Sequence, residues 1–167
     1  MFLAIGFVMM VSGFHAESDR EHKVTANTAL VFSGVYAVLI LLIYFAQITA
    51  VRLDMLSEEA LKILDYKRFG LFFSYDLLGY GVMSLAAFFI GLAIKAESRL
   101  DKWLKGLLIA HGAFFISCII TPILGVFNSE MDSAYWIGML ILEFWCCYFL
   151  PICILSYLHF AKIGKKQ

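Results

Sequence analysis

Two acidic residues interrupt otherwise uncharged stretches of this chain. Asp76 is the only charged residue in the stretch 69–94, and Glu143 is the only one in 133–161. A carboxyl group at membrane depth is costly to bury, faces the interior of a helix bundle and marks a candidate functional site. If these stretches cross a membrane, the chemistry to expect is binding of a proton, a cation or a small ligand.

The two carboxyls are expected at a similar level of the bundle. At a rise of about 1.5 Å per residue, Asp76 lies roughly 10 Å and Glu143 roughly 14 Å from the same, outer end. Gln47 lies near that end too, and tyrosines flank and follow Asp76. The sequence therefore predicts an outer polar cluster, made of Gln47, Tyr75, Asp76, Tyr80 and Glu143.

Two interpretations of this cluster remain open. No lysine or arginine is expected at that depth, so at least one of the two acids is expected to hold a proton. A functional cluster would be a proton-linked or cation-binding site. A structural cluster would use protonated carboxyls, hydrogen-bonded to tyrosine or backbone, to hold helices together.

Two histidines lie near the opposite, inner end. His111 falls early in the third long apolar stretch and His159 at the end of the last. If both rings faced one pocket they could hold a haem; the alternative for His159 is a helix-end histidine favoured by the helix dipole. No other cofactor, no metal and no catalytic residue is predicted, because the cysteines lack paired metal-ligand spacing and no serine lies in a nucleophile motif. The cysteines are Cys118, Cys146, Cys147 and Cys153.

The elements that position these residues are long apolar segments. Hydrophobic residues make up 62% of the 167 residues, and a spanning helix needs about 20 apolar residues. No strict alternation of the kind found in membrane β-barrels is present. The sequence thus predicts a single all-α domain, an integral membrane helical bundle with four full transmembrane helices. Their expected ranges are 24–51, 69–94, 106–128 and 134–161, with kinks at Pro122 and Pro151.

Two shorter segments complete the expected bundle. The apolar stretch 1–14 is too short to cross, and we interpret it as part of a spanning helix that starts upstream. A signal peptide and a re-entrant piece are the alternatives. The segment 57–67 begins with Ser57 as a helix cap and predicts an amphipathic helix on the outer surface.

Basic residues predict the orientation. Nine lysines and arginines fall on one side of the predicted bundle and four on the other, which places the C-terminus in the cytoplasm. The nine are Arg20, Lys23, Lys95, Arg99, Lys102, Lys105, Lys162, Lys165 and Lys166. The net charge of zero argues against a nucleic-acid partner.

The stretch from Phe73 to Leu85, with Asp76 ahead of Leu78-Gly79-Tyr80, resembles a segment of small uncharacterised bacterial multi-pass membrane proteins. The resemblance implies a location in the bacterial inner (plasma) membrane and an additional N-terminal span. It supports Asp76 as the residue to test and implies no activity.

Two classes of function remain. The first is transport or small-ligand binding through the outer polar cluster. The second is a non-catalytic membrane subunit or scaffold, and an enzyme is less favoured than either. The expected partners are the lipid bilayer, a small ligand or protons, and a second copy or another membrane protein.

Overall fold

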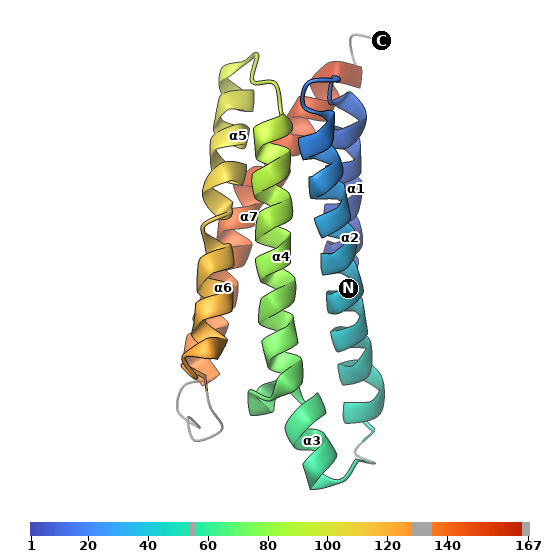
Figure 1. Cartoon of the computed structure of the whole chain (residues 1–167), viewed down its shortest axis with the longest axis vertical. Coiled ribbons are helices and arrows are strands. Elements are labelled where there is room, and N and C mark those ends of the chain that lie inside the picture. The colour runs from blue at the N-terminus through green and yellow to red at the C-terminus, as the bar shows by residue number, and fades with distance from the viewer. Residues whose placement is uncertain (54–55, 128–134, 165–167) are drawn as a thin grey trace.

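The computed structural model describes residues 1–53, 56–127 and 135–164, and this part of the chain is helical without any strand. Short links join helices that run up and down the bundle (Figure 1). The elements are α1 (Phe2–Glu17), α2 (Lys23–Ala46), the π-helical turn η1 (Gln47–Val51), α3 (Glu58–Leu64), the 3-10 turn η2 (Tyr66–Arg68), α4 (Leu71–Ala93), α5 (Arg99–His111), α6 (Phe114–Ile123) and α7 (Tyr135–Gly164).

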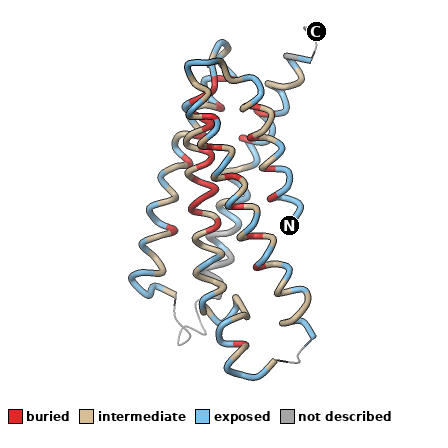
Figure 2. The backbone as a smooth tube through the Cα atoms, turned by 45° about the vertical axis from the view of Figure 1, so that its right-hand side comes forward, coloured by how far each residue is buried: buried red, intermediate tan, exposed pale blue. Residues whose placement is uncertain are grey.

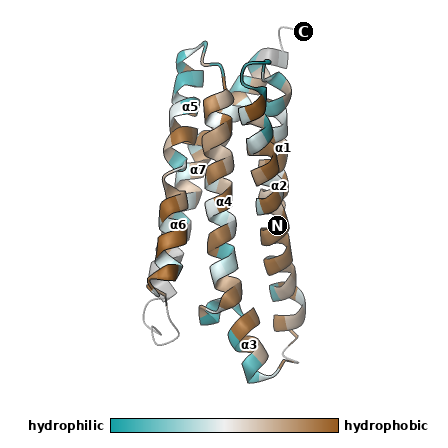
Figure 3. Ribbon diagram, viewed as in Figure 1, coloured by the Kyte–Doolittle hydropathy of each residue, from teal (hydrophilic) through white to brown (hydrophobic). Residues whose placement is uncertain are grey.

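Four helical segments are long and apolar enough to cross a membrane, which confirms the predicted all-α bundle. They are Lys23–Val51, Leu71–Ala93, Arg99–Ile123 and Glu143–Lys162. The shorter apolar helix α1 lies beside α2 along one half of the bundle (Figure 1). Hydrophobic residues follow the shafts of the helices, and hydrophilic ones gather mainly towards their ends (Figure 3). The chain is thus a multi-pass membrane protein.

The third span begins earlier than expected. The sequence predicts a third span that begins at residue 106, but α5 already begins at Arg99. Ser98 and Asp101 form a capping box there: the Asp101 amide donates to Ser98 Oγ at 3.2 Å, and the Ser98 amide donates to Asp101 Oδ2 at 2.8 Å. A capping box satisfies two of the otherwise unpaired amides of the first turn, so the helix begins where the box forms.

The break in this span does not lie at Pro122, where the sequence predicts a kink. It separates α5 from α6 at Gly112 and Ala113. A Cβ at Gly112 would lie 2.8 Å from Cβ of Phe88 on α4. The chain therefore turns where only a glycine allows this approach to α4.

Helix α4 is the centre of the bundle, in contact with α1, α2, α5 and α6. Burial is concentrated along it (Figure 2), because small residues on several sides of the helix let neighbouring helices approach closely. The buried small residues are Gly79, Gly81, Ser84, Ala86, Ala87, Gly91 and Ala93. Helix α7 packs against α5, and most of its described residues are at least partly exposed.

The predicted helix in 57–67 is present as α3. Ser57 Oγ accepts a hydrogen bond from the Ala60 amide at 3.3 Å, and Glu58 and Glu59 occupy the first turn. Leu61 is its buried residue. The side that faces the bundle is thus apolar, and the exposed side carries the charges.

Candidate functional site

Asp76 lies in the first turns of α4 and inside the bundle. Five residues separate it from Leu71, a rise of roughly 8 Å. Its Oδ1 atom is buried and has no hydrogen-bond partner. Within the described residues, no lysine, arginine or histidine forms an ion pair with it. The expectation that Asp76 points inward is met, and none of the described cationic side chains is paired with its carboxyl.

Three tyrosines lie in the neighbourhood of this carboxyl, and we call them the tyrosine cluster: Tyr36, Tyr44 and Tyr80. The Tyr44 and Tyr80 hydroxyls lie 3.4 Å apart, and the Tyr36 and Tyr80 ring centroids 6.1 Å apart. All three are close enough to Asp76 for an electrostatic interaction. The Trp145 ring closes the cluster from α7, with its centroid 5.2 Å from that of Tyr80.

The other members of the predicted outer polar cluster lie elsewhere. Gln47 Nε2 donates to the Leu64 carbonyl at 2.7 Å, and Gln47 Oε1 accepts from the Tyr66 amide at 3.4 Å. Its amide therefore ties the end of α2 to the link before α4. The Tyr75 side chain is 39% exposed, on the outside of α4.

The expectation that Glu143 faces Asp76 inside the bundle is wrong, because the Glu143 side chain is exposed. Near Glu143, the residues of α7 that pack towards the bundle are its aromatic neighbours Trp145 and Tyr148, which contact Tyr80 and His111. The placement of Glu143 on the apolar surface of a span has no explanation in this structure. Asp76 is thus a single buried carboxyl and not one of a pair.

His111 is enclosed by aromatic rings. Its side chain is 1% exposed and its Nδ1 atom has no hydrogen-bond partner. Four ring centroids lie 4.9–5.5 Å from the imidazole centroid, those of Phe114, Trp145, Tyr148 and Phe149. The Tyr148 hydroxyl donates to the Leu107 carbonyl at 2.8 Å, which holds α7 against α5 at this level.

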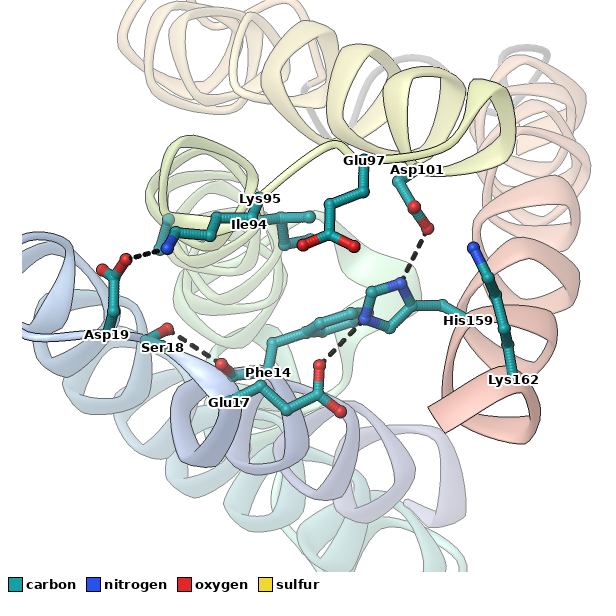
Figure 4. A pocket seen from close by; sticks show the side chains of 11 residues that line it. Phe14, Glu17, Ser18, Asp19, Ile94, Lys95, Glu97, Asp101, His159 and Lys162 are labelled. Atoms are coloured by element: carbon teal, nitrogen blue, oxygen red, sulfur yellow. Dashed lines mark hydrogen bonds and ion pairs between the residues drawn. The ribbon is translucent and has the colours of Figure 1, made fainter. Parts of the chain in front are cut away.

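His159 lies between two carboxylates at the end of the bundle where α1 ends and α5 begins (Figure 4). Its Nδ1 atom is 2.8 Å from Asp101 Oδ1 on α5, and its Nε2 atom is 2.8 Å from Glu17 Oε2 on α1. The Asp101 side chain is 6% exposed and that of Glu17 31%. A single imidazole thus joins three helices, and we call these three residues the histidine bridge.

The histidine bridge lines a pocket of about 300 Å³, which we call the end pocket. Phe14, Ala93 and Ile94 supply buried apolar walls. The remaining charged side chains of the lining are Asp19, Lys95, Glu97 and Lys162.

The link after α1 contributes an ion pair to the lining of the end pocket. Lys95 Nζ donates to Asp19 Oδ2, and this hydrogen bond holds the pKa of the Asp19 carboxyl well below its usual range. The same hydrogen bond raises the pKa of Lys95. Both groups are therefore charged around neutral pH, and the pair connects this link to the one between α4 and α5.

The two histidines do not face one pocket. Ten residues of α5 separate Asp101, the partner of His159, from His111, a rise of roughly 15 Å. His159 lines the end pocket, whereas His111 lies among the aromatic rings deeper in the bundle. The predicted alternative of a haem held by both rings does not fit this arrangement. Among the described residues, no group of three or more histidine, cysteine, aspartate and glutamate side chains is arranged to hold a metal ion.

The sequence contained signals for the residues that were not predicted. Tyr36 and Tyr44 follow the same helical face as Gln47, which indicates that they point into the bundle. Ser98 and Asp101 have the spacing of a capping box. No local pattern links Glu17 to His159, because the two lie 142 positions apart.

Comparisons of this chain with protein-family models, with curated proteins and with solved structures give no match. The class of the protein therefore follows from its four apolar helices, and the case for a function comes from the Asp76 site and the end pocket.

Proposed function

We propose that this membrane protein is a proton-linked protein of the transport or small-ligand-binding class, and that Asp76 is its proton-binding group. The observation that carries the proposal is the buried Asp76 Oδ1 atom without a hydrogen-bond partner. An ionised carboxylate in that position, with no cationic side chain paired to it, would be strongly unfavourable. A bound proton removes the charge, and its release requires a change in what surrounds the carboxyl.

The tyrosine cluster supports this role. Hydroxyl groups both donate and accept hydrogen bonds. The Tyr44 and Tyr80 hydroxyls are neighbours of each other and interact electrostatically with Asp76, so we expect them to stabilise either state of the carboxyl when their side chains rotate towards it. A carboxyl that served only to connect helices would be expected to have its oxygens in hydrogen bonds. The unpartnered oxygen therefore favours a carboxyl that binds and releases a proton over one that only connects helices.

The second candidate function is a non-catalytic scaffold or membrane subunit. Gln47 favours it, because both the nitrogen and the oxygen of its side-chain amide form hydrogen bonds that fix the link after α3. If Asp76 acted in the same way, its ability to ionise would have no effect. The two functions therefore differ in what happens when the carboxyl alone is removed.

The experiment compares Asp76→Asn with Glu143→Gln in the purified full chain. Both changes remove one intramembrane carboxyl and keep its approximate shape, but Asp76 has a buried carboxylate oxygen, whereas the Glu143 side chain is exposed. Thermal stability is measured in detergent between pH 5 and 8, with Na⁺, K⁺ and small amines and carboxylates as probes. The same variants, reconstituted in liposomes, are tested for proton uptake driven by each probe.

The proposal predicts that the parent and Glu143→Gln share the same pH response and the same shifts with the probes. Asp76→Asn should stay folded and lose both. If Asp76→Asn matches the parent in pH response, probe shifts and proton uptake, the proton-linked function is contradicted and the scaffold takes its place. If Na⁺ or K⁺ stabilises the parent with no pH dependence, the group binds a cation and the proton is ruled out.

A further inference from the structure

We propose that the histidine bridge is a proton-controlled latch that closes the end pocket between α1 and α7. It involves His159, Glu17 and Asp101, and it is independent of Asp76, which lies near the opposite end of α4. The latch is closed when the imidazole carries both protons, and its α1 side opens when one proton leaves.

The number of hydrogen bonds that the His159 ring can donate depends on its protonation state, and this couples the bridge to pH. An imidazolium donates from both nitrogens, whereas a neutral imidazole donates from one and presents a lone pair at the other. Both ring nitrogens of His159 lie 2.8 Å from a carboxylate oxygen. After loss of one ring proton, one of these contacts becomes a lone pair facing an anionic oxygen, which is repulsive. The bridge to both helices therefore needs the second proton.

The two carboxylates hold the ring unequally. Asp101 is nearly buried, and its second oxygen accepts from both the Ser98 amide and the Ser98 hydroxyl. Within the described residues, the Glu17 carboxylate accepts no hydrogen bond other than the one from His159, and its side chain is more exposed to solvent. The remaining ring proton is therefore expected on Nδ1, towards Asp101. The contact that is lost is therefore the one between His159 Nε2 and Glu17 on α1.

No other charged group that lines the end pocket, among the described residues, is paired with Glu17 or Asp101 and could take the place of the second proton on His159. Lys162 on α7 lines the same pocket but forms no ion pair in the part of the chain that the structure describes. Lys95, in the link after α4, is engaged by Asp19. Glu97 adds a further negative charge from that link, and Phe14 and Phe160 cover the rest of the ring. Two carboxylates thus share a single imidazolium.

Release of Glu17 would loosen the rim of the end pocket. At this level α1 meets α7 through the bridge and through Phe14, whose ring centroid lies 4.6 Å from that of Phe160. Gly13 lies beneath Phe160, and further from this end α1 also contacts α7 through Phe7 with Phe149 and through Met10 with Ser156. These deeper contacts keep the two helices together, so release of Glu17 acts on the last turn of α1 alone. Without the contact to Glu17, the last turn of α1 and the end of α7 can separate, and the pocket becomes open from the side.

The experiment measures amide hydrogen exchange of the full chain in detergent from pH 5 to 9, corrected for the intrinsic pH dependence of exchange. The peptides of interest cover residues 10–18 and 153–162. In the parent, both are expected to exchange about tenfold faster or more once His159 has lost its second proton. This is the factor expected when a hydrogen bond to a charged group is lost.

Two substitutions at Glu17 separate the latch from a purely structural contact. Glu17→Gln supplies an amide N–H, which can donate to the lone pair of neutral His159 at Nε2. This variant should stay closed over the whole pH range. Glu17→Ala cannot bond to the ring in either state and should exchange fast at every pH. His22→Gln, a variant of a half-buried histidine at the same end that pairs with Asp19, is the matched control and should behave as the parent.

Three results would overturn the latch. The first is exchange of both peptides in the parent that does not change with pH after correction. The second is a Glu17→Gln variant that keeps the pH response of the parent. The third is a His22→Gln variant whose hydrogen exchange no longer depends on pH, because this would assign the pH dependence to the pair of His22 with Asp19.

Discussion

Replacing Gly91 by alanine tests the close contact of α4 with α5, which fixes the walls of the end pocket. A Cβ at Gly91 would lie 2.9 Å from Leu108 Cβ and 3.1 Å from the Ile109 backbone nitrogen. Both atoms are fixed to the backbone of α5, so no side-chain rotation relieves the contact. The two helices must move apart to admit the methyl group.

The expected magnitude comes from comparison with Gly34→Ala in α2. A Cβ at Gly34 meets nothing within 4 Å. Both substitutions gain about 1 kcal/mol of helix propensity, so this gain cancels in the comparison. Overpacking a closely packed site costs about 1–3 kcal/mol. Gly91→Ala is therefore expected to be less stable than Gly34→Ala by about 1–3 kcal/mol.

The assay is unfolding of both variants and the parent by SDS in mixed micelles, followed by helical circular dichroism and tryptophan fluorescence. Gly34→Ala should equal or exceed the parent in unfolding free energy, and Gly91→Ala should fall below it. A Gly91→Ala variant as stable as Gly34→Ala would refute the described approach of α4 and α5.

Three further predictions concern the ends of the bundle. Lys95→Met removes the ion pair with Asp19 and should lower stability only slightly at neutral pH, because this pair is exposed. Since the pKa of Asp19 is lowered, the pair stabilises the fold above about pH 4 and loses this effect at lower pH. The melting temperatures of parent and variant should therefore converge as the pH falls below that value. Ser57→Ala removes the α3 cap and should destabilise that helix by about 1 kcal/mol, seen as faster hydrogen exchange of 58–64 without a change elsewhere. The C-terminus is predicted in the cytoplasm, so a C-terminal reporter that fluoresces only there should be bright; activity of a periplasm-specific reporter at that position would reverse the orientation.

The fold could be predicted because apolar length alone specifies spanning helices. The inward direction of Asp76 also followed from the sequence, since Ser84, Ala87 and Gly91 share its helical face and are small enough for close packing. The direction of Glu143 could not be predicted in the same way. Helix α7 is apolar all round, so no polar face of the helix indicates which side is buried.

The histidine bridge could not be predicted because it joins three distant parts of the chain. The contact of His159 with Asp101 depends on where α5 begins. Lys102 and Lys105, on either side of Trp103, are typical of a loop between spans, so the sequence predicts that the third span begins only after them. The capping box at Ser98 was the local signal for a helix there. The haem alternative failed for the same reason, since an earlier start of α5 places Asp101, and not His111, at the level of His159.

Infrared spectroscopy of the carboxyl groups tests the state of Asp76 most directly. A protonated carboxyl without strong hydrogen bonds absorbs at a higher C=O stretching frequency than one in water, whereas a carboxylate lacks this band. The account predicts such a band in the purified protein at neutral pH, absent from Asp76→Asn and unchanged in Glu143→Gln. A parent spectrum that loses nothing on Asp76→Asn substitution would contradict a proton bound at Asp76.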